Sequence, residues 1–181
     1  MDKKTDRKEE IFNLLLDASE KSFSRLFEEH NEQFYYCSLV MMDCAVPCIT
    51  ALSEEAYHEL LVEYADGDDS SEEDRSYYRW AYAESPYLGF GYEEYFNEVS
   101  DCFLKDVSHA LSDTEFTEHV NDWLEAMVKV MKTLKEKGLF AGREILLLAE
   151  QQPSDTDCNV DNARYLNDEA LFNAWCKDNI E

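Results

Sequence analysis

Two stretches of the sequence carry carboxylates at spacings that resemble a calcium-binding loop. In the segment 66–77, the first three ligand positions of such a loop are occupied by Asp, Asp and Ser. The loop also requires glycine at its sixth position and glutamate at its twelfth, but this sequence has Ser71 and Tyr77 there. The segment 155–166 fails the same test, because valine and leucine stand at those positions. The spacing therefore predicts no calcium site, and we expect no resident metal.

The cysteines, histidines and glycines form no catalytic motif either. The only close cysteine pair, Cys44-x3-Cys48, has Pro47 inside it, and the four histidines form no HxxH or HxxxH pair. The sequence GFG at 89–91 leads into an acidic, aromatic segment rather than a phosphate-binding loop. A Cys–His pair that meets only in the folded chain stays open as an alternative. With 41 acidic residues, neighbouring carboxylates carry no information, so we predict a non-enzyme without a cofactor.

The charge of the chain is strongly negative and unevenly distributed. Its 181 residues include 41 acidic and 16 basic side chains, a formal net charge of −25. Only two of those bases, Arg75 and Arg79, lie between residues 26 and 104. Such a field attracts basic proteins and repels nucleic acids and anionic membranes. We therefore predict a basic protein partner, with no direct nucleic-acid binding and no membrane binding; charge that serves solubility alone is the alternative.

The hydrophobic pattern of the chain indicates in which cellular compartment the protein is expected. No apolar run approaches the 18 residues of a membrane span, and the opening MDKKTDRKEEIF lacks the apolar core of a signal peptide. We therefore expect a cytoplasmic protein whose six cysteines are reduced and mostly buried.

The segment 66–94 combines acidic residues with a cluster of aromatics. Core packing accounts for most of the aromatics, and residues 79–82 alternate as a half-buried strand would, with Arg79 paired to a carboxylate of the same domain. Five aromatics beside the Ser-Pro and Gly-Phe-Gly sequences of 85–91 lie in a loop-like stretch that is hard to bury. Aromatics next to carboxylates are typical of a surface that binds a basic partner. We predict that the partner-binding residues are Asp66, Asp68, Asp69, Glu72, Glu73, Asp74, Tyr77, Tyr78, Tyr87, Phe90, Tyr92, Glu93 and Glu94.

Hydrophobic periodicity predicts one α+β domain over residues 1–181, with an acidic loop at 66–75. We expect a small, mostly antiparallel sheet packed against several helices. The predicted strands are a central strand at 33–43, joined by a hairpin through Asp43 to an edge strand at 44–52, and a third at 143–152. The predicted helices are 6–29, 53–65, 92–110, one from Ser112 to Gly138 and a last one after Asn167-Asp168. Asp6 with Glu9 and Ser112 with Glu115 are the expected capping boxes.

Several stretches occur in an order that resembles a known family. They are FYYCSLVMMD with a second strand ending in TALSEEA, then YYRWAYAESPY, and finally ILLLAEQQPSDTD with NARYLND. Together they resemble the bacterial family known as domain of unknown function 4303, whose members are single domains of about this length. The chain departs from that pattern where family members tend to carry a second tryptophan and this sequence has AESPY, and in the proline and cysteines of the second strand.

The resemblance implies no catalytic residues. Families of this kind are found among the immunity proteins of bacterial toxin systems, so it implies that the basic partner is a cognate toxin, neutralised by binding. Two alternatives stay open: an enzyme or small-molecule-binding protein with an unrecognised pocket, and an interaction protein whose charge serves solubility only.

Overall fold

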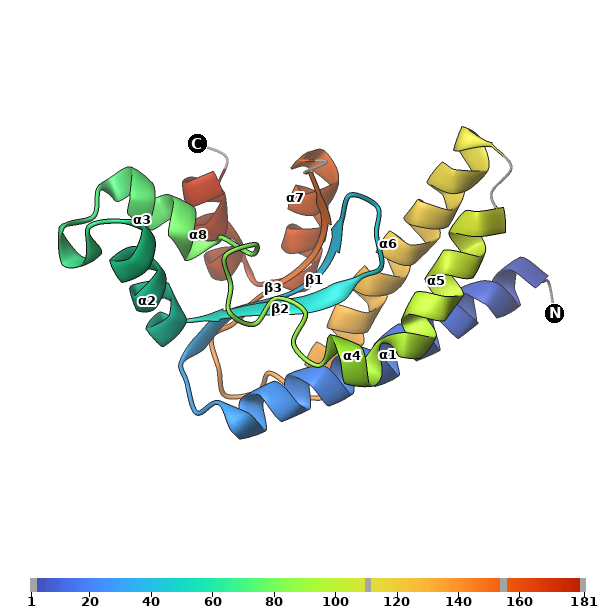
Figure 1. Ribbon diagram of the computed structural model, residues 1–181, viewed down its shortest axis with the longest axis horizontal. Coiled ribbons are helices and arrows are strands. Elements are labelled where there is room, and N and C mark those ends of the chain that lie inside the picture. The colour runs from blue at the N-terminus through green and yellow to red at the C-terminus, as the bar shows by residue number, and fades with distance from the viewer. Residues whose placement is uncertain (1–2, 110–111, 154–155, 180–181) are drawn as a thin grey trace.

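The computed structural model describes residues 3–109, 112–153 and 156–179 (Figure 1). It confirms an α+β single domain. The elements of the described chain are α1 (Lys3–Glu29), β1 (Phe34–Met42), β2 (Cys48–Ser53), α2 (Glu54–Tyr64), the 3-10 helix η1 (Gly67–Asp69), α3 (Glu72–Arg79), α4 (Tyr92–Tyr95), α5 (Asn97–His109), α6 (Asp113–Glu136), β3 (Leu146–Gln152), α7 (Thr156–Leu166) and α8 (Glu169–Asn179).

The sheet has the order β2-β1-β3 and is mixed. β1 pairs with β2 in antiparallel register through the predicted hairpin, where Asp43 and Cys44 adopt left-handed backbone angles (φ 50° and 55°). β1 pairs with β3 in parallel register, with Tyr36 opposite Leu146. The prediction of a mostly antiparallel sheet is therefore wrong for one of the two pairings. The helices α2 to α6 form a long crossover between β2 and β3, and such a connection permits parallel pairing.

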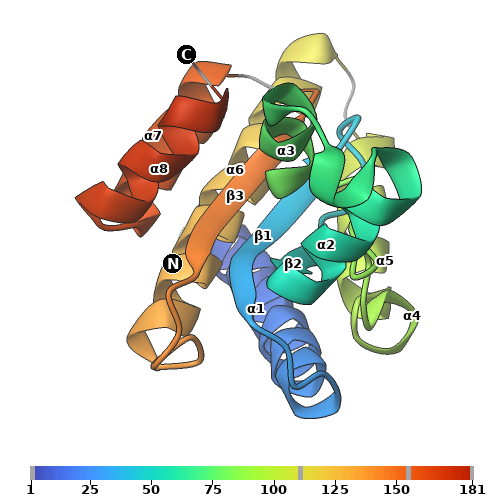
Figure 2. The same ribbon diagram turned by 90° about the vertical axis from the view of Figure 1, so that its left-hand side faces the viewer.

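Helices cover both sides of the sheet. α1 and α6 pack against each other, α1 against β2, and α6 against β1 and β3. Figure 2 shows these two helices behind the strands, with α2 and α3 in front. α7 lies beside β3, and α8 contacts both α7 and α3. As expected for the predicted central strand, every residue of β1 except Met42 is buried.

Three asparagines cover the free edge of β3. Asn167 accepts a hydrogen bond from the Leu147 N–H (2.8 Å) and donates to the Leu147 carbonyl (2.7 Å). Asn159 makes the same reciprocal pair with Gln151 at 3.1 and 3.0 Å, and Asn162 donates to the carbonyl midway between them. These side chains from α7 and the turn after it replace a neighbouring strand, which protects an edge that would otherwise pair with another chain.

The free edge of β2 is covered by the segment that follows α3. The Ser85 hydroxyl donates to the Ala51 carbonyl at 2.5 Å, and the Gly89 N–H donates to the Ile49 carbonyl at 2.8 Å. Residues 85–91 are thereby fixed against the sheet, although their Ser, Pro and Gly content is typical of a free loop.

Most of the predicted helix boundaries are confirmed. The hydroxyls of Ser53 and Ser112 accept hydrogen bonds from the backbone N–H groups three residues later, as N-caps do. Asp168 caps α8 through the Leu171 N–H at 3.0 Å. Gly138 follows the C-cap of α6 with φ 83°, as predicted.

Four predictions about local structure need correction. α1 begins at Lys3, so Asp6 lies inside the helix and is not its N-cap. The predicted acidic loop 66–75 contains η1 and the first half of α3, because Ser71 caps a new helix there. Residues 79–82 are the end of α3 and a turn rather than a strand, and the predicted helix 92–110 is divided between α4 and α5. Residue 110, the last residue of that predicted helix, lies outside the residues that the structure describes.

None of the six cysteines, all of which are among the described residues, forms a disulfide bond. Cys37, Cys48 and Cys102 are buried as expected, whereas the other three are partly exposed. Burial raises the pKa of the Cys48 thiol to about 11 and that of Cys37 further, so both are protonated and unreactive at neutral pH. In the described part of the chain, no helix combines the length and the apolar character needed to cross a bilayer.

Candidate binding site

The acidic half of the predicted surface forms one exposed corner of the molecule. Five carboxylates on η1, its flanking residue and the first turn of α3 are exposed, and we call them the acidic end: Asp66, Asp68, Asp69, Glu72 and Glu73. Asp74 is partly buried and accepts a hydrogen bond from the Ser71 hydroxyl at 2.6 Å. Tyr77 is 59% exposed and Tyr78 is partly buried against Tyr77 and Tyr64.

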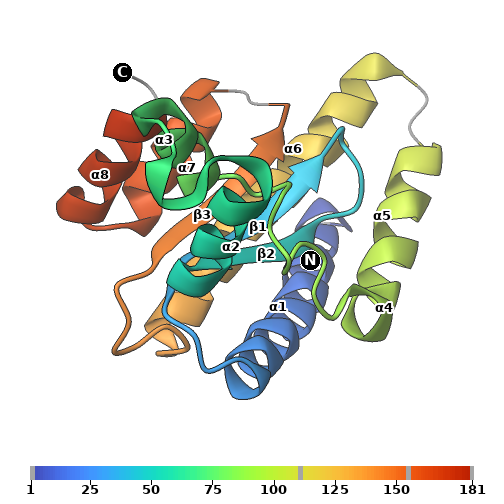
Figure 3. The same ribbon diagram turned by 60° about the vertical axis from the view of Figure 1, so that its left-hand side comes forward.

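The other half of the predicted surface lies elsewhere. Tyr87, Phe90, Tyr92, Glu93 and Glu94 belong to the segment around α4, which packs on α1 and lies apart from α3 (Figure 3). The thirteen predicted residues therefore do not form one continuous face. The two halves are separated because residues 85–91 are attached to the edge of β2. No local sequence pattern predicts this attachment.

Tyr87 is the clearest departure from the prediction. Its side chain is only 7% exposed, and its hydroxyl donates to a Glu32 carboxylate oxygen at 2.5 Å. Burial is the main cause of the raised pKa of Tyr87, and the nearby Glu32 carboxylate raises this pKa further. Phe90 and Tyr92 are partly buried against the core, and Glu94 is paired with Arg25 at 2.5 Å. Only Glu93 of this half is both exposed and outside the ion pairs of the described residues.

The charges of the acidic end lie close together in the sequence and are not neutralised. Some carboxylates on other parts of the surface lie beside bases, as Asp106 does beside Arg7 (2.6 Å) and Glu94 beside Arg25. Within the described chain, none of the five carboxylates of the acidic end forms an ion pair. The nearest base in sequence, Arg75, donates instead to the backbone carbonyls of Asp68 (2.5 Å) and Ser70 (3.2 Å).

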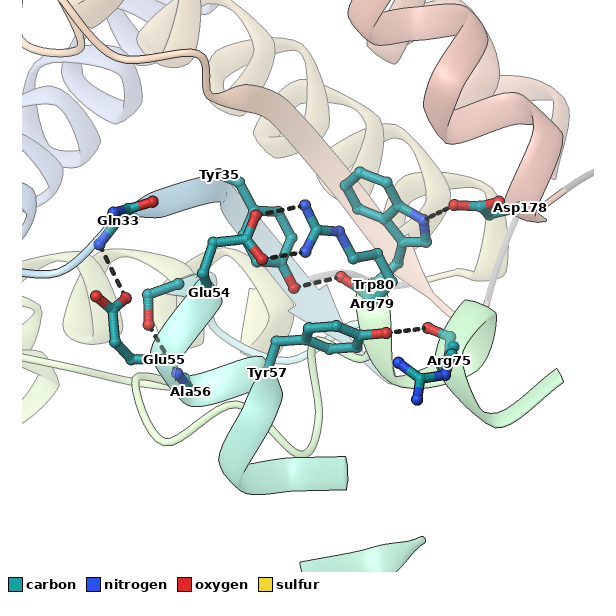
Figure 4. A network of polar contacts seen from close by, with 11 residues as sticks. Gln33, Tyr35, Glu54, Glu55, Ala56, Tyr57, Arg75, Arg79, Trp80 and Asp178 are labelled. Carbon is teal, nitrogen blue, oxygen red and sulfur yellow. Dashed lines mark hydrogen bonds and ion pairs between the residues drawn. The ribbon is translucent and has the colours of Figure 1, made fainter. Parts of the chain in front are cut away.

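A polar network built on Arg79 holds this corner against the sheet (Figure 4). The Arg79 guanidinium donates to both carboxylate oxygens of Glu54, at 2.6 and 2.7 Å, and lies over the Tyr35 ring. The Tyr35 hydroxyl donates to the Arg79 carbonyl (2.7 Å), and that of Tyr57 donates to the Arg75 carbonyl (3.1 Å). The predicted pairing of Arg79 within the domain is confirmed, and it ties α3 to α2 and β1.

Next to the acidic end is a cleft of about 680 Å³. It lies between α3, the turn after it, α7, α8 and the end of β3. Four carboxylates line it, together with two indoles and two phenols: Glu73, Glu84, Glu150, Asp178, Trp80, Trp175, Tyr77 and Tyr82. Two of these residues, Glu73 and Tyr77, also belong to the predicted surface, so the cleft and the acidic end are continuous.

Glu150 is a buried carboxyl group at this cleft. It is 7% exposed, and its Oε2 atom accepts hydrogen bonds from the hydroxyls of Tyr36 (2.6 Å) and Ser38 (2.8 Å). Burial raises its pKa, while the hydrogen bonds from Tyr36, Ser38 and Gln152 act in the opposite direction and are outweighed. A buried carboxyl group with a shifted pKa in a concave site is a recognised mark of function.

Glu150 is one of 41 acidic residues, so its residue type alone is no reason to single it out. The available signal was its place in a buried apolar strand, LLLAEQQ, where an acid is costly unless it has partners.

The walls of the cleft are fixed by contacts between α3 and α8. The Trp80 indole N–H donates to the Asp178 carboxylate at 2.9 Å (Figure 4). The Ser76 hydroxyl donates to the Asp178 backbone carbonyl at 3.2 Å. No lysine, arginine or histidine is among the described residues that line the cleft. In the described chain, no group of three or more His, Cys, Asp or Glu side chains is placed to hold a metal ion.

The fold and the site together define a small, acidic α+β protein with an aromatic, carboxylate-lined cleft. The model of the family described as "Domain of unknown function (DUF4303)" matches residues 15–168, and the chain belongs to this family. The matched region includes the acidic end, Arg79, Trp80 and Glu150, but not α8, which supplies Trp175 and Asp178. No curated protein and no solved structure matches the chain.

Proposed function

We propose that this chain is a cytoplasmic protein-binding protein that neutralises a basic partner, a cognate toxin, by occupying the partner's cationic surface. The observation that supports this proposal is the acidic end, where five exposed carboxylates within eight residues have no cationic side chain to balance them. Unpaired charge on one corner raises the rate of encounter with a surface of opposite charge. The neighbouring exposed Tyr77 offers the aromatic contact area typical of binding hot spots.

The test is affinity capture from a lysate of the organism that encodes the protein. Three tagged baits are compared: the native chain, a patch variant and a control variant. The patch variant carries Asp66→Lys, Asp68→Lys, Asp69→Lys and Glu72→Lys, none of which lines the cleft. The control variant carries Glu28→Lys, Asp101→Lys, Glu136→Lys and Glu144→Lys, which are exposed carboxylates on other parts of the surface.

Each of the four substitutions adds two charges, so both variants change the formal net charge from −25 to −17. We expect one stoichiometric basic protein on the native and control baits, absent from the patch variant. The association should slow steeply as salt shortens the Debye length below about 10 Å. If both variants lose capture of the basic protein equally, binding depends on the net charge alone and not on the acidic end. Retention by the patch variant would contradict the role of the acidic end.

A second candidate function is a small-molecule-binding protein or enzyme, and one observation favours it. Glu150 is buried at a cleft of about 680 Å³, within the range of small-ligand sites. If the native bait captures no partner at any salt concentration, this candidate gains, and ligand binding to the cleft becomes the measurement that separates the two.

A further inference from the structure

We propose that the cleft beside the acidic end binds an organic cation, a guanidinium or primary ammonium group, between Trp80 and Trp175 and beside the carboxyl group of Glu150. This inference does not require the protein partner proposed above. The same chemistry is carried by a free small molecule and by the arginine or lysine side chain of a bound protein.

The sign of the ligand follows from the charges that surround the cleft. Glu73, Glu84, Glu150 and Asp178 line it, and no basic side chain is among its described lining residues. An anion would meet four carboxylates without a counter-charge, whereas a cation would reduce their mutual repulsion. A cleft of one sign with low-dielectric walls concentrates ligands of the opposite sign.

The aromatic walls favour an organic cation over a metal ion. Trp80 is held in place by its hydrogen bond to Asp178, and Trp175 is 6% exposed at the cleft. Indole faces attract guanidinium and ammonium groups, and this attraction grows when the cation is desolvated. The described lining residues also lack a cluster of metal-ligating side chains, so the aromatic and carboxylate combination is the distinctive feature.

Glu150 supplies the hydrogen-bonding anchor. The two hydroxyl donors of Tyr36 and Ser38 act on the same oxygen, Oε2, and both are neutral groups. A buried carboxylate without a counter-charge is energetically costly, and a cation that enters the cleft offsets this cost. A guanidinium or primary ammonium group can donate hydrogen bonds to the carboxylate, which a quaternary ammonium group cannot do.

The tryptophans provide the assay. The chain has three, and the third, Trp123, is fully buried with its indole N–H bonded to Asp106 at 3.2 Å, outside the cleft. Indole ¹⁵N–¹H resonances are recorded for the native protein during titration with agmatine and with N-acetyl-arginine N-methylamide. N-acetyl-citrulline N-methylamide, which has nearly the same shape without the charge, is the matched control ligand.

We expect saturable shifts of the Trp80 and Trp175 resonances with both cations, an unchanged Trp123 resonance and no response to the citrulline compound. Glu150→Gln should weaken binding at least about tenfold, whereas Glu144→Gln, an exposed carboxylate away from the cleft, should leave it unchanged. Tighter binding of agmatine indicates a free small molecule as the natural source, and tighter binding of the capped arginine indicates a side chain of a partner.

Three results would overturn the inference: no shift of either cleft tryptophan up to about 10 mM ligand, equal binding of the citrulline compound, or undiminished binding to Glu150→Gln. The citrulline comparison uses the native protein alone, so it decides the question even if the variant fails to fold. The patch variant described above leaves the cleft residues intact. The patch variant should therefore lose protein capture and keep cation binding. The two proposals, one on the acidic end and one on the cleft, can thus fail independently of each other.

Discussion

The guanidinium carbon of Arg79 lies 3.6 Å from the centre of the Tyr35 ring, while the same group donates two hydrogen bonds to Glu54. Stacking and bidentate pairing both depend on a planar guanidinium. One side chain from the end of α3 thus joins β1 to α2. Because Trp80 follows directly and bonds to Asp178 of α8, the position of Arg79 also sets one wall of the cleft.

We expect Arg79→Lys to destabilise the fold by about 1–2 kcal/mol. Lysine keeps the charge but cannot make the paired hydrogen bonds to Glu54 or stack as a planar group on the Tyr35 ring. The estimate is modest because Glu54 is 45% exposed, which weakens the ion pair through solvent screening. Urea unfolding measures the effect. Arg164→Lys is the control, since its side chain is 63% exposed and its replacement should cost under about 0.5 kcal/mol. Equal effects of the two substitutions would contradict a special role for Arg79.

The parts of the fold that depend on local chemistry follow from the sequence. Ser53 and Ser112 precede acidic helix starts, and the central strand is a continuous apolar run, so these two caps and this strand are found by spacing alone. The direction of β3 depends on where a long helical crossover returns to the sheet, and no spacing encodes that. The same applies to Tyr87 and to Glu150, whose surroundings consist of segments distant in sequence.

The two serine caps are expected to differ in strength. The Ser112 hydroxyl caps an exposed helix end, so Ser112→Ala should cost about 1 kcal/mol. The Ser53 hydroxyl is fully buried, accepts from the Ala56 N–H at 3.0 Å and donates to Glu32 at 2.5 Å. Ser53→Ala therefore removes a cap and leaves the Oε2 atom of Glu32 without the Ser53 donor, and about 2–3 kcal/mol should be lost. Chemical unfolding of the two variants side by side checks the order, and a larger loss for Ser112→Ala would refute it.

The hydrogen bonds between Asn167 and the free edge of β3 lead us to expect a stability change that depends on pH when this residue is replaced by aspartate. Asn167 Nδ2 donates to the carbonyls of Leu147 and Ala163, at 2.7 and 2.8 Å. In Asn167→Asp a carboxylate would face both carbonyls, so we expect a loss of about 2–3 kcal/mol at neutral pH that becomes smaller in acid, where the new group is protonated and can donate. Unfolding at neutral and acidic pH tests this. Asn13→Asp, on the exposed face of α1, should show no such recovery.

The raised pKa of Glu150 makes its contribution to stability depend on pH in a definite direction. In the folded state the carboxyl group holds its proton above its ordinary pKa of 4.5, because burial disfavours the charged form. The folded state therefore binds more protons than the unfolded state in this range. The stabilisation from the protonated group is fully present below pH about 4.5 and is lost as the pH rises through the folded-state pKa.

Glu150→Gln removes this titration, since the amide oxygen can still accept from Tyr36 and Ser38 while the side chain stays neutral. Relative to the native protein, the variant should become progressively more stable as the pH rises above about 4.5. The difference in unfolding free energy across that range is the measurement, and a constant difference would show that Glu150 titrates normally. A saturating organic cation should reduce the difference in unfolding free energy between the native protein and the variant at neutral pH. The cation stabilises the ionised carboxylate of the native protein and has no such partner in the variant.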